Sequence, residues 1–249
     1  MFWKSKEVPV RPRVAAIIPA AGSSTRMGTN KLLLPLGDLP VLAHTLLAFE
    51  QCPLIDEIIV VCREADIIPY GNLAQQFGCE KVRQVLRGGD TRPQSVLAGL
   101  SACSDAVEFV TIHDGARPLV SQDIIMQTVS AALESNAAAP VVAMKDSIKR
   151  IAQGKILSDV PRDSIAAVQT PQVFRRTLIS TALKEAIASG ASLTDDCAAV
   201  ERMGVTVTAT QGSYRNLKIT TPEDIPMALA LLEQEESTCA SGTDMMSTN

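Results

Sequence analysis

The chain has 249 residues, of which 46% are hydrophobic and 3% aromatic, and its formal net charge is −4. This length suits one large α/β domain or two small ones, and the acidic balance argues against a general nucleic-acid binder. The apolar stretches are too short to cross a membrane, the first 13 residues lack the apolar region of a secretory signal, and the six cysteines are scattered, so we expect a cytoplasmic protein with free thiols.

Short apolar runs alternate with helical patterns along the first 144 residues. The apolar runs predict buried strands at 14–20, 57–62, 81–86, 109–114 and 138–144. The helical patterns cover residues 40–52, 66–77 and 94–103 and a segment that Ser121 caps. This alternation indicates βαβ units, so we predict an α/β fold with a doubly wound, mostly parallel, Rossmann-like sheet. Ligands bind such sheets beyond the carboxyl ends of the strands.

The region from 145 to 170 breaks this alternation. Short alternating runs around a Gly154 turn predict a β-hairpin arm that projects from the core, and an arm of this kind suggests a homodimer. Beyond it we expect a helix at 176–189, a short helix from Thr194, strands at 205–210 and 216–220, and a last helix with Thr221 as its N-cap. Residues 1–236 are expected to form a single domain, and the Ser-rich segment 237–249 to be a disordered tail.

The turn after the first strand, AAGSSTRMGTNK, is the most informative segment. It lacks both the Walker A pattern and the dinucleotide-binding fingerprint. Its small residues would let backbone N–H groups approach a phosphate chain, and Arg26 and Lys31 could neutralise a triphosphate. A tight strand–helix turn with two solvated cations is the structural alternative.

Six ordered motifs carry a resemblance to a known family. They are AAGSSTRMG with its following Lys31, RGGDTRPQSVLAGL, IHDGARPLV, QTPQVF, LTDDCAAVERMG and NLKITTPEDI. Together they resemble the 2-C-methyl-D-erythritol 4-phosphate cytidylyltransferases of the non-mevalonate isoprenoid pathway, within the nucleotidyltransferase superfamily. The resemblance extends from Val14 to Leu232 and implies a nucleotidyltransferase fold. It also implies transfer of CMP from CTP to methylerythritol phosphate, with Mg²⁺ as cofactor and pyrophosphate as the second product.

The attacking group in such a reaction is a phosphate monoester, which is already anionic at neutral pH and needs no general base. The obstacle is repulsion between two polyanions, so cations and positioning should supply the catalysis. The resemblance implies catalytic roles for Arg26, Lys31 and Lys218 and a metal ligand in Asp114. It places the nucleotide against Ala20, Ala21, Gly22, Gly88, Gly89, Asp90, Arg92 and Ser95. It places the polyol phosphate against Arg117, Ser147, Arg162, Thr170 and Thr194.

Three alternatives stay open. The first is purely structural: Asp114 could cap a turn, Thr194 could cap a helix, and Lys218 could lie on an exposed strand. The second is a ribitol 5-phosphate cytidylyltransferase, since Ser147 stands where the resembled family often has Thr, Gly115 replaces an Ala, and a common Trp before QTPQ is missing. The third is an inactive nucleotide-binding regulator, although the presence of Arg26, Lys31 and Asp114 argues against it.

Overall fold

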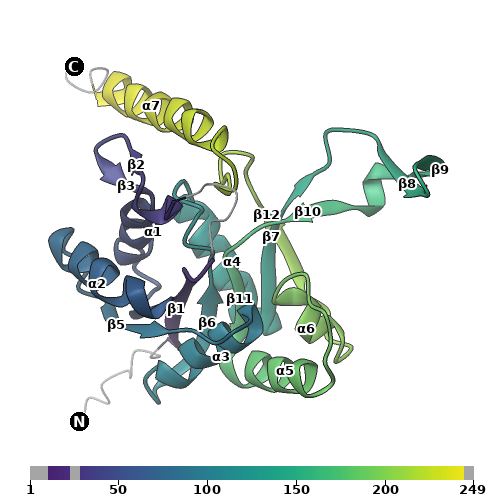
Figure 1. Ribbon diagram of the computed structural model, residues 1–249, viewed down its shortest axis with the longest axis horizontal. Helices are drawn as coiled ribbons and strands as arrows, with labels where there is room; N and C mark the ends of the chain where they lie inside the picture. Colours follow the sequence, from purple (N-terminus) through teal and green to yellow (C-terminus); the bar gives the residue numbers. More distant parts are fainter. Residues whose placement is uncertain (1–10, 23–28, 244–249) are drawn as a thin grey trace, which may run out of the picture.

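The computed structural model describes residues 11–22 and 29–243, with side chains as far as residue 234. A mostly parallel sheet of eight strands forms its centre, in the order β10-β7-β11-β6-β1-β4-β5, with β12 paired to β7 (Figure 1). The strands are β1 (Arg13–Pro19), β4 (Glu57–Cys62), β5 (Val82–Arg87), β6 (Val107–Ile112), β7 (Ala137–Ala143), β10 (Ala166–Val168), β11 (Gln172–Arg175) and β12 (Thr208–Gln211). Neighbours are parallel from β6 to β5, whereas β11 is antiparallel to β6 and β7. The predicted doubly wound α/β fold is confirmed.

Helices cover both faces of this sheet. The side chains of β1 alternate between two buried clusters, with Val14, Ala16 and Ile18 on one face and Ala15 and Ile17 on the other. The first face packs against α1 (Val41–Glu50), α2 (Ile67–Gln76), α4 (Gln122–Ser135) and α7 (Asp224–Thr243). The second face packs against α3 (Arg92–Ala102), α5 (Arg176–Ala188) and α6 (Cys197–Glu201). The central strands β1, β4 and β6 are therefore buried on both sides, which explains their apolar runs.

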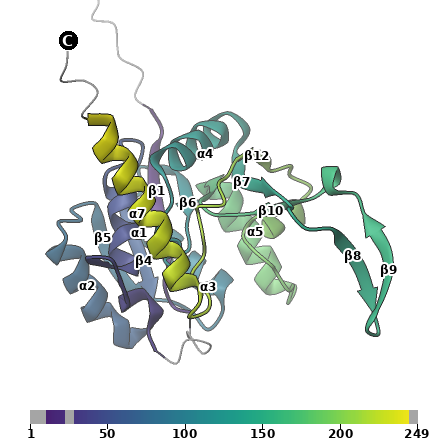
Figure 2. The same cartoon turned by 90° about the horizontal axis from the view of Figure 1, so that it is seen from above.

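A separate two-stranded antiparallel sheet, β8 (Ile148–Ala152) and β9 (Lys155–Val160), stands away from the body in both views (Figures 1 and 2). Its turn uses Gln153 and Gly154, both with positive φ. Its exposed side chains include Ile151, Ile156 and Leu157, each more than 60% accessible. A smaller hairpin joins β2 (Pro35–Leu36) to β3 (Leu39–Pro40), and three 3₁₀ turns are η1 (Lys31–Leu33), η2 (Glu64–Asp66) and η3 (Arg162–Ser164).

Of two helix caps that the sequence suggests, one is confirmed and one is wrong. Ser121 caps α4 as expected, its hydroxyl accepting from the N–H of Ile124. Thr194 caps no helix: α6 begins at Cys197, and the carboxylate of Asp195 instead accepts from the N–H of Ala198 at 2.9 Å.

The carboxyl-terminal segment also differs from its predictions. Residues 216–220 form no strand. The last helix begins at Asp224, whose carboxylate accepts from the N–H groups of Thr220 and Thr221 at 2.7 and 2.8 Å, so Thr221 is not its N-cap. This helix continues to Thr243, past the start of the predicted disordered tail. Among the described helices, none is long and apolar enough to cross a bilayer.

Candidate functional site

A pocket of about 380 Å³ opens at the carboxyl ends of β1 and β6, as the rule for parallel sheets requires. Its walls come from the loops after these strands, the η1 turn, the start of α3 and the segment before α7. The lining residues are Pro19, Ala20, Ala21, Gly22, Lys31, Leu32, Gly89, Asp90, Thr91, Arg92, Ser95, Asp114, Gly115, Ala116, Lys218 and Thr220. Most of the residues predicted for nucleotide binding and catalysis therefore meet in one place.

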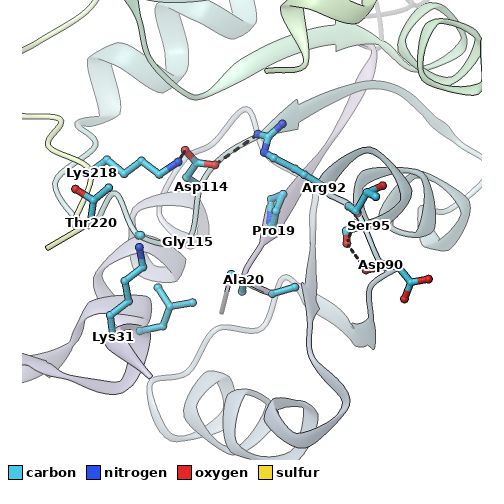
Figure 3. Close-up of a pocket in the computed structure, with 16 residues that line it drawn as sticks. Pro19, Ala20, Lys31, Asp90, Arg92, Ser95, Asp114, Gly115, Lys218 and Thr220 are labelled. Carbon is cyan, nitrogen blue, oxygen red and sulfur yellow. Dashed lines mark hydrogen bonds and ion pairs between the residues drawn. The ribbon is translucent and has the colours of Figure 1, made fainter. Parts of the chain in front are cut away.

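Asp114 is the electrostatic centre of this pocket. Lys218 and Arg92 approach its carboxylate from opposite sides (Figure 3), at 2.8 and 3.5 Å. The guanidinium of Arg117 lies 3.7 Å from this carboxylate. Burial alone would raise the pKa of Asp114, but Lys218, Arg92 and Arg117 outweigh it and hold that pKa below its usual range. The carboxylate is therefore ionised at neutral pH, beside an excess of positive charge.

Three loops that carry these groups are joined by hydrogen bonds. The ammonium of Lys31 donates to the carbonyl of Ile219 at 2.6 Å, and the N–H of Ile219 donates to the carbonyl of Ala116 at 2.8 Å. Arg117 donates to the carbonyl of Asn216 at 2.6 Å. Lys31 and Lys218 are therefore held at one pocket although they lie far apart in the sequence.

The other end of the pocket is built on glycines that cannot be replaced without movement. A Cβ atom on Gly88 would lie 2.5 Å from Oγ of Ser95, and one on Gly89 would lie 2.4 Å from Cβ of Gln94. The hydroxyl of Ser95 donates to the carbonyl of Gly89 at 3.3 Å, and Thr91 and Gln94 form a capping box at the start of α3. Gly88 itself lines an adjoining pocket of about 250 Å³, which shares Ala21, Gly89 and Asp90 with the first.

The residues predicted for polyol phosphate binding are not assembled in this pocket. Arg117 and Thr170 lie behind Asp114, where the N–H of Asp114 donates to the Thr170 hydroxyl at 3.2 Å. Ser147, Arg162 and Thr194 are exposed, and none of them lines the pocket. Arg162 donates to the carbonyl of Lys145 at the base of the β8–β9 hairpin. Arg26 lies outside the described residues.

Sequence reasoning missed His113, which supports the loop of Asp114. It is fully buried, with Nδ1 3.0 Å from the Thr170 hydroxyl and Nε2 3.2 Å from the carbonyl of Arg117. Burial lowers the pKa of His113 to about 4, so the ring is neutral near pH 7. Because a carbonyl can only accept, Nε2 carries the proton and Nδ1 accepts from Thr170.

Two further buried polar residues escaped sequence reasoning, Asp196 and Asn216. Asp196 lies 2.7 Å from the guanidinium of Arg92; burial raises the pKa of this carboxyl to about 6 against the opposing effect of Arg92. The amide of Asn216 donates to the carbonyl of Thr170 at 2.8 Å and so supports the loop that leads to Lys218. Asp196 lies in the motif LTDDCAAVERMG and Asn216 in NLKITTPEDI. Their contacts with Arg92 and Thr170 join segments that are distant in the sequence, so the motifs alone do not predict them.

The donor set of the pocket suits a metal that arrives with phosphate oxygens. No cluster of three or more His, Cys, Asp or Glu side chains that could hold a metal occurs among the residues whose side chains are described. Asp114 offers a carboxylate inside the pocket, and Mg²⁺ commonly takes only one or two carboxylates plus substrate phosphates. Asp196 is buried and does not line the pocket, so Asp114 is the better candidate ligand.

Comparison with known proteins agrees with this geometry. The family model described as 2-C-methyl-D-erythritol 4-phosphate cytidylyltransferase matches residues 14–234. The chain is 44% identical to the enzyme of that name from Geotalea uraniireducens, covering 90% of this chain and 99% of the relative. It is 42% identical to that from Halalkalibacterium halodurans, covering 89% and 98%.

Solved structures give the same relationship. The crystal structure of 4-diphosphocytidyl-2C-methyl-D-erythritol synthase from Anaerococcus prevotii superposes with a TM-score of 0.81 at 33% identity, covering 89% of this chain and 96% of that one. The 2-C-methyl-D-erythritol 4-phosphate cytidylyltransferase from Thermus thermophilus superposes with a TM-score of 0.73 at 31% identity, covering 87% and 98%. The chain therefore belongs to the 2-C-methyl-D-erythritol 4-phosphate cytidylyltransferase family.

Proposed function

We propose that this protein transfers CMP from CTP to 2-C-methyl-D-erythritol 4-phosphate, giving 4-diphosphocytidyl-2-C-methyl-D-erythritol and pyrophosphate. The observation that carries the proposal is the pocket in which one ionised carboxylate is surrounded by Lys218, Arg92 and Arg117, with Lys31 on the adjacent wall. Such a site has the charge needed to hold a triphosphate, and the family relationship supplies the substrates.

The chemistry follows from charge and position. An oxygen of the methylerythritol phosphate attacks the α-phosphorus of CTP, the bond from this phosphorus to the bridging oxygen breaks, and pyrophosphate leaves with the electron pair. Lys31, Lys218 and Arg26 stabilise the negative charge that builds up on the α-phosphate and the leaving group. Nucleotidyltransferases typically need a divalent metal ion; we propose Mg²⁺, which would neutralise phosphate oxygens when held by Asp114.

The nucleotide is proposed to lie along the glycine-bearing wall. Ala20, Ala21 and Gly22 leave room on one side, and Gly88, Gly89 and Ser95 form the other side; Asp90 and Arg92 complete this wall. Backbone N–H and carbonyl groups here can read the polar edge of a pyrimidine. A Cβ atom on Gly89 would overlap Gln94, so this position of the wall requires glycine.

The polyol phosphate is proposed to contact Arg117 and Thr170 near Asp114. Ser147, Arg162 and Thr194 complete this subsite in our proposal, and a homodimer formed through the β8–β9 hairpin would bring the partner's hairpin to it. The exposed Ile151, Ile156 and Leu157 of the hairpin support this proposal, because burying them against a second subunit is favourable. The cytoplasmic location inferred from the sequence stays a prediction.

A substrate panel tests the function. Pyrophosphate release is measured with CTP and Mg²⁺ in the presence of methylerythritol phosphate, ribitol 5-phosphate or neither, and again with UTP and ATP. We expect the highest kcat/KM with CTP and methylerythritol phosphate and almost no release without an acceptor. A higher kcat/KM with ribitol 5-phosphate would assign the protein to the alternative reaction. CTP binding without turnover on either acceptor would favour the regulator.

A further inference from the structure

A buried polar cluster lies behind the wall that carries Lys31. It consists of Asn30, Asp66 at the end of η2 and Tyr70 in α2. The amide nitrogen of Asn30 donates to the Asp66 carboxylate at 3.0 Å, and the Tyr70 hydroxyl lies 2.9 Å from this nitrogen and 3.1 Å from the amide oxygen. Asp66 and Tyr70 are 6% and 0% exposed, and Asn30 is half-buried. None of the three lines the pocket.

The chemistry of these groups fixes the orientation of the Asn30 amide. An ionised carboxylate only accepts, so the nitrogen of the amide faces Asp66 and the oxygen faces away. That oxygen accepts from the N–H of Leu32 at 3.2 Å and so caps the η1 turn. Arg63 holds Asp66 from the other side, with its Nε 2.7 Å from the carboxylate. Burial raises the pKa of Tyr70 to about 12, which keeps its hydroxyl proton in place.

The capped turn is the segment from which Lys31 projects. Lys31 is its first residue, between the polar anchor Asn30 and the buried Leu32, and the N–H of Leu34 closes the turn on the carbonyl of Lys31 at 3.3 Å. A lysine side chain has several rotatable bonds, so a fixed backbone narrows the volume its ammonium can reach. The position of Lys31 in the pocket therefore depends on side chains of α2 and η2.

We propose that Asp66 and Tyr70 are positioning residues for the reaction, because through Asn30 they hold the turn that places the Lys31 ammonium against the triphosphate. The inference rests on the proposed function of this pocket. It adds residues that never touch the substrate and that act on the chemical step more than on nucleotide binding.

The test compares variants in the full-length protein. Asp66→Ala removes the acceptor that orients Asn30, and Tyr70→Phe removes a single oxygen atom. Two controls match them: Glu64→Ala removes an exposed carboxylate from the same η2 turn, and Leu73→Ala destabilises α2 but removes none of the hydrogen-bonding groups of the cluster. For each protein, kcat and the KM for CTP are measured from pyrophosphate release, and the free energy of unfolding from urea titration.

We expect Asp66→Ala to lower kcat about 10- to 100-fold while the KM for CTP changes less than about threefold, since a small displacement of a catalytic group is costly. Tyr70→Phe should lower kcat in the same direction but by less, and both controls should keep kcat. If Asp66→Ala does not fold, Tyr70→Phe decides alone.

Two results would overturn the inference. One is an unchanged kcat in Tyr70→Phe and Asp66→Ala; the other is an equal loss of kcat in Leu73→Ala at matched stability. Both presuppose an active wild type. A wild type that releases no pyrophosphate from CTP with any acceptor defeats the proposed function itself, and this inference with it.

Discussion

The ammonium of Lys218 lies 2.8 Å from the carboxylate of Asp114, the residue for which we propose metal binding. The pair helps to keep the carboxylate ionised. In our proposal a metal ion held by Asp114 would compete with Lys218 for this carboxylate, and the released ammonium would be available to the phosphates. Metal binding and the supply of this cation would then be coupled.

This coupling predicts the behaviour of Asp114→Asn. Because the neutral amide is a weaker ligand for a hard cation, the Mg²⁺ concentration at half-maximal rate should rise about tenfold or more, and kcat should fall. The measurement is a Mg²⁺ titration of pyrophosphate release, with EDTA-treated wild type as the zero-metal reference. Asp123→Asn, an exposed substitution in the first turn of α4, serves as the control. An unchanged titration curve in Asp114→Asn would remove Asp114 as the ligand.

Lys31→Ala and Arg26→Ala should reduce turnover far more than nucleotide affinity. The charge that these cations offset develops in the transition state, so we expect kcat to fall about 100-fold or more while the dissociation constant of CTP rises less than about tenfold. Steady-state kinetics and calorimetric titration with CTP give the two numbers. Lys31→Arg keeps the charge and serves as the control for Lys31. Equal losses in turnover and affinity would instead assign these residues to ground-state binding.

Mixing subunits tests whether Arg162 acts on its own pocket or on the partner's. Arg162→Ala and Lys31→Ala proteins are each expected to have low activity. If the hairpin delivers Arg162 to the partner, a mixed dimer contains one intact pocket, and an equimolar mixture should recover about a quarter of the wild-type activity. No recovery, with mixed dimers shown by differential tagging, would place Arg162 beside its own pocket. A fully active monomer in sedimentation would exclude the dimer.

The buried His113 predicts a pH dependence of stability. Its folded pKa of about 4 lies below its ordinary value of 6.5 because burial disfavours the charged ring. Between these values the unfolded chain binds a proton that the folded protein does not, so stability falls as the pH drops from 6.5 towards 4, by about 3 kcal/mol in all.

Asp196, with a folded pKa of about 6, acts in the opposite sense, because the folded protein then binds the proton. The difference between wild type and His113→Gln therefore isolates the histidine. Urea unfolding from pH 7 to pH 4 should show a smaller loss of stability in His113→Gln. Parallel curves would contradict the assignment.

Two glycines near the pocket should respond in opposite ways to alanine. A Cβ atom on Gly115 would lie 3.3 Å from Cδ1 of Leu42 and 3.4 Å from Cγ2 of Ile18, which small side-chain shifts can accommodate. Gly115→Ala should leave kcat within about twofold and raise the free energy of unfolding by about 0.5 kcal/mol. Gly89→Ala, whose Cβ atom would overlap Gln94, should weaken CTP binding about tenfold or more. Urea titration and calorimetry check the pair; similar results for both variants would contradict this reading.

The centre of the sheet was predictable because β1, β4 and β6 are buried on both faces and therefore appear as apolar runs. The helix at 66–77 was predictable in spite of Pro69, since this residue occupies the first turn of α2, where no N–H donor is needed. Residues 216–220 show why alternation alone misleads. Ile219 is buried there as in a strand, but its N–H donates to the carbonyl of Ala116 in a loop, and no strand of the described residues pairs with this segment.

The residues of the candidate pocket that lie within sequence motifs were predictable. Asp114 lies there because it follows β6 at the carboxyl edge of the sheet. Lys31 and the loop of Lys218 are held at the same place by hydrogen bonds through Ile219. The supporting residues were not predictable, because their partners are remote in sequence. Thr170 reaches His113 across 57 positions, and Asn30 reaches Tyr70 across 40. No local pattern encodes such pairs, since only the completed fold brings them together.

The hydrogen bond from Lys31 to Ile219 spans 188 positions of the chain. The two partners of this bond are synthesised at different times, so the glycine-bearing wall at 87–95 precedes residues 216–220 in the growing chain. A nascent chain without this segment has neither Lys218 nor the carbonyl that restrains Lys31. The pocket therefore acquires both features only after residue 219 has been added.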